Sequence, residues 1–363
     1  MTWSRLTAIA SLLLACTPEA NESGSGADTA AGETGMTTTT AAPLTDSSGS
    51  VDETDEGTTE AGTETSADES TSGDPPSGQL ELDTIIDVNS VVSTKGMDVG
   101  AGGEIFLWNY NQDDLERYAD GMLETVANPS ISTSFGTDLS LDDAGGVVVS
   151  QGGNTSGERL LKWDGATGEP LWGEDGVTIP DALLLGLTHA VVDGEQSLYA
   201  CNGAPGNGQV LRIEPGSGTV VGSIDVHEVP LDVAVDASGN HYVLTSIVSN
   251  PLNSGDPVNL RKYDARGTQV AGPVSLTAAI YLTLAADGAL YVTLSDFDAP
   301  TRAIASFDTD LQALSVTELP PEYVGFAGGI TSVGSGDDLR IMITGQEGVG
   351  SDPICDVLVY RPV

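Results

Sequence analysis

Residues 232–244 read DVAVDASGNHYVL, and residues 260–267 read LRKYDARG. In the first stretch apolar residues alternate, a turn that contains Asp236 and Gly239 interrupts them, and the apolar run then resumes. This is the pattern of two antiparallel strands joined by a tight turn. The second stretch is an apolar strand that ends in Tyr263 and is followed by an acid and a glycine. Together the two stretches predict three consecutive strands of one antiparallel sheet.

Both patterns recur along the chain, which makes them parts of a repeat. The hairpin pattern occurs in copies that begin at Gly96, Asp138, His189, Asp232, Tyr281 and Ile330. The strand that ends in an aromatic residue or Ile follows each copy, with Tyr118, Trp163, Ile213, Tyr263, Phe307 and Tyr360 at its end. Every unit except the last continues into a further extended apolar segment. Four short strands in a repeat of about 40 to 50 residues are the signature of a β-propeller blade.

The predicted fold class is therefore all-β, a six-bladed β-propeller of four-stranded blades. The last unit is incomplete, because the sequence stops at its third strand, VLVYRPV at 357–363. An apolar strand without a partner of its own, LELDTIID at 80–87, precedes the first unit. We expect this strand to complete the last blade, which would close the ring and remove an open sheet edge. A seven-bladed ring with one degenerate blade, or an irregular β-solenoid, is the alternative.

The repeat resembles a known group of propellers. Units of the form D-x-h-x-h-D-x-x-G-x-h-Y-V, where h is apolar, followed by h-x-K-Y-D-x-x-G, look like NHL and YVTN repeats and like gluconolactonase-type propellers. The resemblance covers residues 80–363 and implies architecture more than activity, because propellers host many functions. A gluconolactonase-like hydrolase would bind one metal ion on the axis through Glu, Asn and Asp. Asn202 and Asn240 fall in turns or at strand starts, which argues against lactonase activity.

The stretch WDGATGEPLW at 163–172 resembles the repeat of pyrroloquinoline-quinone-dependent dehydrogenases. Those enzymes use the motif in most blades, whereas its full form occurs once here, and its counterparts lack the closing Trp. We interpret it as the hairpin between the third and fourth strands of the second blade. Trp163 and Trp172 are then blade-packing residues, and no cofactor-binding residue is predicted.

The first 16 residues (1–16) have the features of a lipoprotein signal peptide. Arg5 precedes a ten-residue apolar run, which is far shorter than the roughly 20 residues of a membrane-spanning helix. The run ends in LLAC, which resembles a bacterial lipobox, Leu13–Cys16. The resemblance implies export, a lipid on the Cys16 thiol and an anchor in the bacterial cell membrane. Thr17 favours the outer membrane, at its periplasmic face or on the cell surface, under enterobacterial sorting rules. An ordinary signal peptide is the alternative.

Residues 17–78 have the composition of a disordered linker. They contain 14 acidic residues and no Lys, Arg, His or aromatic residue. Such a segment cannot bury enough apolar surface to offset its chain entropy. We expect a flexible acidic tether with an r.m.s. length of about 45 Å that holds the propeller domain, 79–363, away from the membrane. An acidic interaction tail is the alternative.

Charge and cysteine content limit the partners and the covalent links of the domain. Residues 79–363 carry 40 acids and 11 bases, which argues against nucleic acid, because phosphate binding depends on Lys and Arg. The large negative net charge also favours a soluble monomer.

Cys201 and Cys355 fall in blades 3 and 6, which oppose each other across a six-bladed ring. This separation should keep them too far apart for a disulfide. Bases on third strands should pair with acids of the domain; these are Arg117, Lys162, Arg212, Arg261 and Lys262.

Three consecutive blades place Asp138, His189 and Asp232 at one aligned position at the start of the first strand. Two carboxylates and an imidazole could hold a divalent cation such as calcium, or His189 could act as a base that an Asp orients. The alternative is that these side chains bind the backbone of the neighbouring blade and fix its packing. Asp98, two positions further along its strand, could join the group.

The sequence thus favours a non-catalytic binding or scaffold module in the cell envelope. Its expected partners are the lipid bilayer, through acylated Cys16, and an envelope protein or glycan. A metal-dependent hydrolase of the lactonase type, with its site at the propeller axis, is the competing class.

Overall fold

The structure is a computed structural model. It describes residues 77–363 except 91–93, 110–111, 130–134, 153–157, 205, 207, 227, 249–256, 296–301, 324, 326 and 348–353. The predicted signal peptide with Cys16 and nearly all of the predicted linker lie outside the described residues. Among the residues that are described, no helix is long and apolar enough to cross a membrane.

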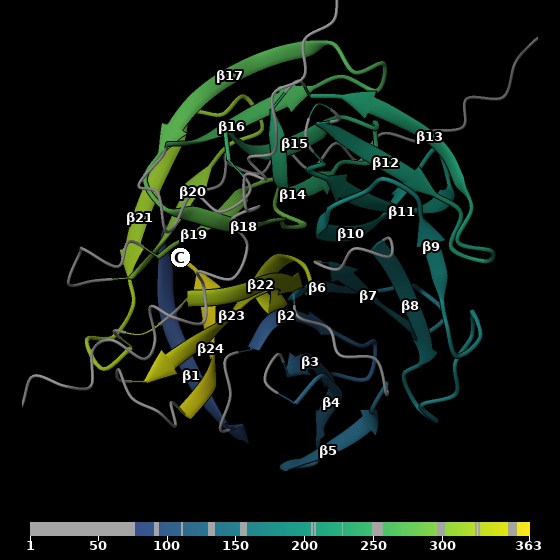
Figure 1. Ribbon diagram of the computed structural model, residues 1–363. Coiled ribbons are helices and arrows are strands. Elements are labelled where there is room, and N and C mark those ends of the chain that lie inside the picture. The colour runs from purple at the N-terminus through teal and green to yellow at the C-terminus, as the bar shows by residue number, and fades with distance from the viewer. Residues whose placement is uncertain are drawn as a thin grey trace, which may run out of the picture. The chain divides into compact units, whose positions relative to one another are not determined.

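The described strands form six four-stranded antiparallel sheets arranged as blades around a central axis (Figure 1), which confirms the predicted six-bladed propeller. Blade 1 consists of β2 (Thr94–Val99), β3 (Ile105–Asn109), β4 (Asp114–Ala119) and β5 (Met122–Ala127). Blade 2 consists of β6 (Phe135–Leu141), β7 (Gly146–Gly152), β8 (Glu158–Asp164) and β9 (Val177–Ile179). Blade 3 consists of β10 (Leu184–Val192), β11 (Glu195–Asn202), β12 (Gln209–Ile213) and β13 (Val220–Asp225).

The remaining blades follow the same order from the axis outwards. Blade 4 consists of β14 (Val229–Val235), β15 (His241–Ser246), β16 (Val258–Tyr263) and β17 (Gln269–Leu276). Blade 5 consists of β18 (Ala279–Leu284), β19 (Leu290–Leu294), β20 (Ala303–Phe307) and β21 (Ala313–Glu318). Blade 6 consists of β22 (Ala327–Val333), β23 (Arg340–Glu347), β24 (Ile354–Pro362) and β1 (Leu80–Ser90), with the short 3-10 helix η1 (Gly336–Asp338) before β23.

The ring is closed by β1, the strand that the sequence analysis assigned to the last blade. It pairs antiparallel with β24, from Leu80 opposite Pro362 to Asp87 opposite Asp356. In Figure 1 the two ends of the described chain therefore lie side by side, β1 in blue next to β24 in yellow. The prediction of closure is confirmed, and the outer edge of β24 is covered as a sheet edge requires.

The hydrophobic core lies between the blades. Six clusters of buried side chains fill the six blade interfaces, each with members from two neighbouring blades. Trp108 of blade 1 and Trp163 of blade 2 stack across one interface, with ring centroids 6.3 Å apart. Trp172 donates its indole N–H to the carbonyl of Gly216 in the next blade at 3.1 Å. WDGATGEPLW is thus a blade-packing hairpin, as interpreted.

Basic residues on the third strands of blades 1, 2 and 4 tie each of these blades to the next one. Arg117 donates to the carbonyl of Gly165, Lys162 to that of Pro215 and Lys262 to that of Thr309, at 3.2, 2.7 and 2.8 Å. Each acceptor lies in the turn that follows the third strand of the next blade. The predicted pairing with acids is also present; the pairs are Arg117–Glu124, Lys162–Asp142, Arg212–Glu195, Arg261–Glu228 and Lys262–Asp310.

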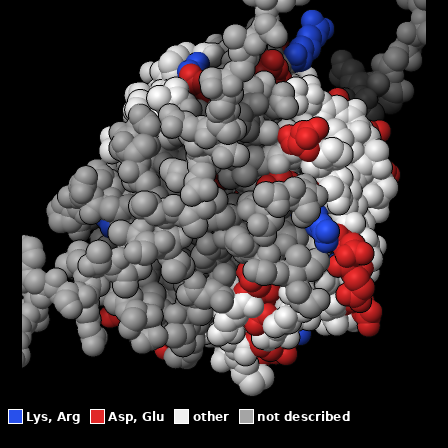
Figure 2. Space-filling model, in the orientation of Figure 1, with Lys and Arg blue, Asp and Glu red and all other residues white. Residues whose placement is uncertain are grey.

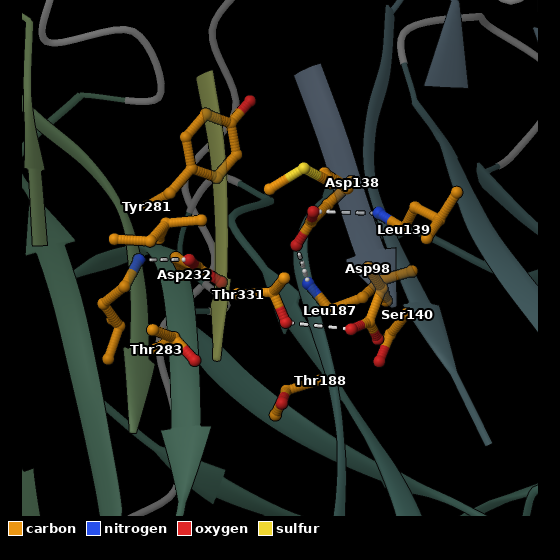
Figure 3. Close-up of a pocket in the computed structure, with 13 residues that line it drawn as sticks. Asp98, Asp138, Leu139, Ser140, Leu187, Thr188, Asp232, Tyr281, Thr283 and Thr331 are labelled. Carbon is orange, nitrogen blue, oxygen red and sulfur yellow. Dashed lines mark hydrogen bonds between the residues drawn. The ribbon is translucent and has the colours of Figure 1, made fainter. Parts of the chain in front are cut away.

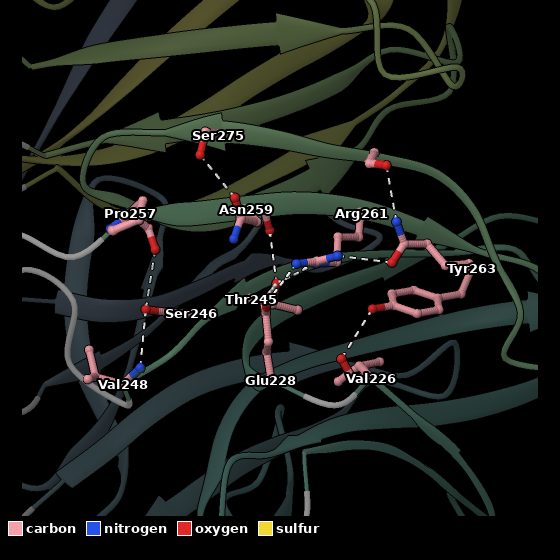
Figure 4. Close-up of polar contacts among 12 residues, drawn as sticks. Val226, Glu228, Thr245, Ser246, Val248, Pro257, Asn259, Arg261, Tyr263 and Ser275 are labelled. Atoms are coloured by element: carbon pink, nitrogen blue, oxygen red, sulfur yellow. Dashed lines mark hydrogen bonds and ion pairs between the residues drawn. The ribbon is translucent and has the colours of Figure 1, made fainter.

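Arg261 acts within blade 4. Its guanidinium contacts Glu228 at 2.6 Å and the Thr245 hydroxyl at 3.1 Å (Figure 4). Thr245 in turn donates to the second oxygen of Glu228 at 2.7 Å. This network holds the segment before β14 against β15 and β16.

Cys201 and Cys355 are both buried, and no disulfide joins them, as predicted. Cys201 lies in β11 of blade 3, and Cys355 lies in β24 of blade 6.

Candidate functional site at the propeller axis

The first strands of the blades enclose a small polar cavity at the axis. Its polar lining consists of three Asp, three Thr, one Ser and one Tyr: Asp98, Asp138, Asp232, Thr188, Thr283, Thr331, Ser140 and Tyr281 (Figure 3). The volume open to the centres of water-sized molecules is about 50 Å³. This is room for a few water molecules or one small ion.

Asp138 and Asp232 make the same contacts in blades 2 and 4. In each, Oδ1 accepts the backbone N–H of the next residue, Leu139 or Val233, at 2.8 Å. Oδ2 of Asp138 accepts the N–H of Leu187 in blade 3, and Oδ2 of Asp232 accepts that of Leu282 in blade 5, both at 2.7 Å. Each carboxylate therefore joins the first strands of two neighbouring blades. This is the contact that the packing alternative predicted.

Asp98 joins three blades. Its Oδ2 accepts the N–H of Leu141 in blade 2 at 2.9 Å. Its Oδ1 accepts the N–H of Val99 in its own strand and the hydroxyl of Thr331 in blade 6, at 2.8 and 2.9 Å. Asp98 has no counterpart in the alignment of the repeats. Its side chain nevertheless points to the same side of the strand as the aligned position two residues earlier, and this alternation is the signal that brings it to the axis.

The structure places Gly186, three residues before His189, at the position in blade 3 that matches Asp138. Leu187 and Leu282 donate the same backbone N–H bond to an Asp of the preceding blade, so Gly186 and Tyr281, which precede them, are equivalent. The misalignment arises because β10 runs three residues further before its turn than β6 does, from Leu187 to Val192 against Leu139 to Leu141. Val192 pairs with Glu195 across two residues in blade 3, whereas Leu141 pairs with Val147 across five in blade 2.

Gly186 is required by the close approach of blade 4. A Cβ atom there would lie 2.3 Å from Oδ1 of Asp232 and 2.6 Å from its Cα. Gly96 takes the same place in blade 1, where a Cβ would lie 2.5 Å from the N atom of Leu139. Glycine and aspartate therefore alternate at this position in blades 1 to 4, as Gly96, Asp138, Gly186 and Asp232.

His189 is not among the described residues that line the cavity. Its backbone N–H and its Nδ1 both contact the Ser140 hydroxyl, at 3.0 and 3.1 Å. The structure thus brings Asp138 and Asp232 to one cavity, adds Asp98, and leaves His189 in the interface between blades 2 and 3.

Burial raises the pKa of all three axial carboxyl groups. For Asp138 the loss of hydration outweighs its two N–H bonds, the charge of Asp98 adds to the effect, and the pKa rises to about 8. The pKa of Asp232 is raised well above its usual value for the same reason, with the charge of Asp138 contributing. Burial also raises the pKa of Asp98. At neutral pH the axis therefore carries less negative charge than three carboxylates would supply.

The axial residues do not fit a metal ion in this arrangement. In the part of the chain that the structure describes, no group of three His, Cys, Asp or Glu side chains is placed to hold one. The oxygens of Asp138 and Asp232 face N–H donors, which a cation would have to displace. The metal site of Asp138, His189 and Asp232 stays a prediction from the sequence.

The surface of the described residues agrees with the acidic composition. In Figure 2 the Asp and Glu side chains gather along the right and lower margins of the face shown, with few Lys or Arg among them. Several acids are fixed in the turns that close the hairpins. Asp236 and Asp264 each accept two backbone N–H groups of their own turn, which lowers their pKa.

Comparison with known proteins supports the fold. The PQQ-bound aldose sugar dehydrogenase from Streptomyces coelicolor matches with a TM-score of 0.56 at 14% identity, over 78% of this chain and 99% of that one. A streptogramin B lyase has a TM-score of 0.46 at 14% identity, over 78% and 87%. Virginiamycin B lyase from Staphylococcus aureus has 0.47 at 12% identity, over 78% and 89%. The likeness to the sugar dehydrogenase, at 14% identity, shows the β-propeller fold alone. No protein-family model and no curated protein matches the chain.

Proposed function

We propose that the propeller is a non-catalytic binding or scaffold module of the bacterial cell envelope. The observation that carries the proposal is the use of the axial carboxylates. Asp138 and Asp232 each join two blades, and Asp98 joins three, through hydrogen bonds to neighbouring first strands. Groups committed in this way hold the ring together and are not available to bind a substrate.

The size of the axial cavity supports the same proposal. Sites for small organic ligands usually have volumes of roughly 300 to 1,000 Å³. The cavity that the described residues enclose at the axis admits a few water molecules. A binding module instead uses a broad outer face, and the domain would recognise an envelope protein or glycan there.

The attachment and the location belong to the same proposal. Acylated Cys16 inserts its lipid into the bilayer, and the acidic segment 17–78 spaces the propeller from it. The protein is then exported, anchored to the bacterial cell membrane and held at the outer membrane as a monomer. The excess of acids makes nucleic acid an unsuitable partner. Replacement of Cys16 by Ser should release the full chain from the membrane fraction and abolish labelling by a fatty-acid probe.

A metal-dependent hydrolase of the lactonase type is the second candidate. It is favoured by the convergence of three carboxyl groups on one axial cavity. A bound divalent cation there would polarise a carbonyl group or activate water, and Asp98, Asp138 and Asp232 are the residues that would have to turn towards it.

Metal analysis of the purified full chain separates the two candidates. We expect less than one equivalent of any divalent cation after dialysis, and no change in metal content on replacement of Asp138 or Asp232 by Ala. One equivalent of metal that either replacement removes would refute the scaffold proposal. Chemical cross-linking of the native envelope, followed by mass spectrometry, then identifies the partner.

A further inference from the structure

The chain is attached to the ring before its first strand begins. Ser77 donates its hydroxyl to the carbonyl of Val363, which directly follows β24 of blade 6. Val363 donates its N–H to the carbonyl of Gln79 at 3.1 Å. Figure 1 shows this place, where the start of β1 lies next to the C-terminus. Ser77–Gln79 therefore bind blade 6 outside the pairing of β1 with β24.

Gly78 extends this attachment to blade 5. Its carbonyl accepts the hydroxyl of Ser306 on β20 at 2.9 Å and the hydroxyl of Ser315 on β21. The two serines lie opposite each other in the sheet, and Ser315 donates its N–H to the Ser306 hydroxyl at 3.0 Å. Gly78 and Ser306 are both buried, which shields the contact from competing water.

The contact with blade 5 requires glycine at position 78. The φ angle of Gly78 is +65°, in the left-handed region that other residues rarely adopt. A Cβ atom there would lie 2.4 Å from Oγ of Ser306 and 2.6 Å from Cβ of Leu314. A larger residue would have to move away from blade 5, and this movement would separate the carbonyl from both hydroxyl donors.

Apolar side chains secure the same place. Leu80, the first residue of β1, and Leu314 of β21 both pack on the hydrophobic cluster between blades 5 and 6. Leu80 also begins the pairing of β1 with β24, opposite Pro362. A load that reached Leu80 directly would open these pairs one after another from this end. Residues 77–79 precede Leu80, so their contacts with two blades have to break first.

We propose that Ser77–Gln79 form a clasp that spreads tension on the tether over blades 5 and 6 and so protects β1, the strand that closes the ring. The inference rests on the proposed function, in which Cys16 is anchored in the bilayer and a partner holds the propeller. A scaffold held at both places carries load through the chain between them. To release the clasp, this load must break the bonds of Gly78 to blade 5 and those of Ser77 and Gln79 to blade 6.

Magnetic-tweezers measurements at constant force on the full chain test the clasp. The chain is produced without export, so that Cys16 carries no lipid and its thiol takes one DNA handle. Ala144→Cys, in an exposed turn of blade 2, takes the second handle, whereas Cys201 and Cys355 are buried. The instrument supplies the load, so the result needs neither a membrane nor a partner. Failure of the proposed anchor would appear in the membrane fractionation of Cys16→Ser and would leave this result unchanged.

The measured quantity is the time for which the chain holds at a fixed force before its first extension step. Gly78→Ala should shorten this time at least roughly tenfold, because it removes the contact with blade 5. Gly121 has a φ of +78° but no atom within 4 Å of a Cβ. Gly121→Ala is therefore matched in backbone strain and should change the time by less than about twofold.

Equal times for the unaltered chain and Gly78→Ala, or equal shortening by Gly121→Ala, would overturn the proposal. If Gly78→Ala does not fold, Ser315→Ala decides, since it removes one hydroxyl donor and adds no atom. A shorter time than that of the unaltered chain is then expected, and an unchanged time would overturn the proposal.

Discussion

The carboxylate of Asp138 accepts the backbone N–H of Leu187 at 2.7 Å, across the boundary between blades 2 and 3. Asp232 and Leu282 make the same contact between blades 4 and 5. Because both oxygens of each side chain already accept an N–H, these residues are part of the framework that sets the spacing of the first strands. The first prediction follows from this geometry.

Replacement of Asp138 by Asn should destabilise the domain by about 1–3 kcal/mol. At pH 6 the Asp138 side chain holds a proton, but its hydroxyl oxygen can still accept an N–H. The NH₂ group of the amide cannot accept one and would face the N–H of Leu139 or Leu187. Urea unfolding at pH 6 measures the change. Asp143 is exposed in the turn just after Asp142, so Asp143→Asn is the matched control and should stay within about 0.5 kcal/mol. A smaller effect at Asp138 than at Asp143 would contradict the framework role.

The pH dependence of stability gives a second prediction. The pKa of Asp138 is raised to about 8 in the folded state from 3.8, so the folded state holds a proton that the unfolded state releases. This contribution to stability is complete below pH 3.8 and is lost as the pH rises through 8. The unfolding free energy should therefore fall between pH 6 and pH 9, and the fall should be smaller in the Asp138→Asn protein. Parallel pH profiles for the two proteins would refute the assignment.

Lys162 provides a third prediction. It forms a buried ion pair with Asp142 and donates to the carbonyl of Pro215 in the next blade. Its replacement by Met leaves the Asp142 charge buried without its cation, which should cost about 3–5 kcal/mol of unfolding free energy. Addition of Asp142→Asn should recover part of this loss.

The matched control for Lys162 is on the same strand. Arg159 lies 3.6 Å from Asp175, whose side chain is 94% exposed, so Arg159→Ala should change the stability by less than about 1 kcal/mol. Urea unfolding of all four proteins provides the test, and equal losses for Lys162→Met and Arg159→Ala would show that the buried pair contributes little.

A fourth prediction concerns Gly186. Replacement by Ala places a Cβ 2.6 Å from the Cα of Asp232 and 2.7 Å from the carbonyl of Leu231, which are backbone atoms that cannot move independently. We expect a loss of about 3 kcal/mol or more, because blades 3 and 4 must separate to make room. Gly222 in β13 has no atom within 4 Å of a Cβ, and Gly222→Ala should be neutral within about 1 kcal/mol. Thermal unfolding of the two proteins distinguishes crowding from a general intolerance to Ala.

The sequence could predict the blades because their signals are local. One period relates the alternating strands, the Asp and Gly turns and the aromatic end of the third strand. The remaining strand at 80–87 can then pair only with the incomplete last unit, as it does with β24. The contacts of Lys162 and Lys262 could also have been inferred, since their acceptors lie 53 and 47 residues further along, which is one repeat. The position of His189 could not be inferred, because the first strand of blade 3 runs three residues further before its turn than that of blade 2.

The closure of the ring gives the last prediction. Val88 on β1 is 1% exposed and packs in the cluster between blades 6 and 1, whereas Ile85 on the same strand is 40% exposed. Replacement of Val88 by Asp places an unpaired charge in that cluster and should detach β1 from β24. Ile85→Asp should be tolerated, because its side chain can remain in water. Limited proteolysis followed by mass spectrometry should find cleavage within 80–90 in the Val88 variant before any other cleavage in the propeller. Since β24 would then present an open sheet edge, that variant should also aggregate at a lower temperature than the Ile85 variant. Equal resistance of the two variants would mean that the ring holds without the strand that closes it.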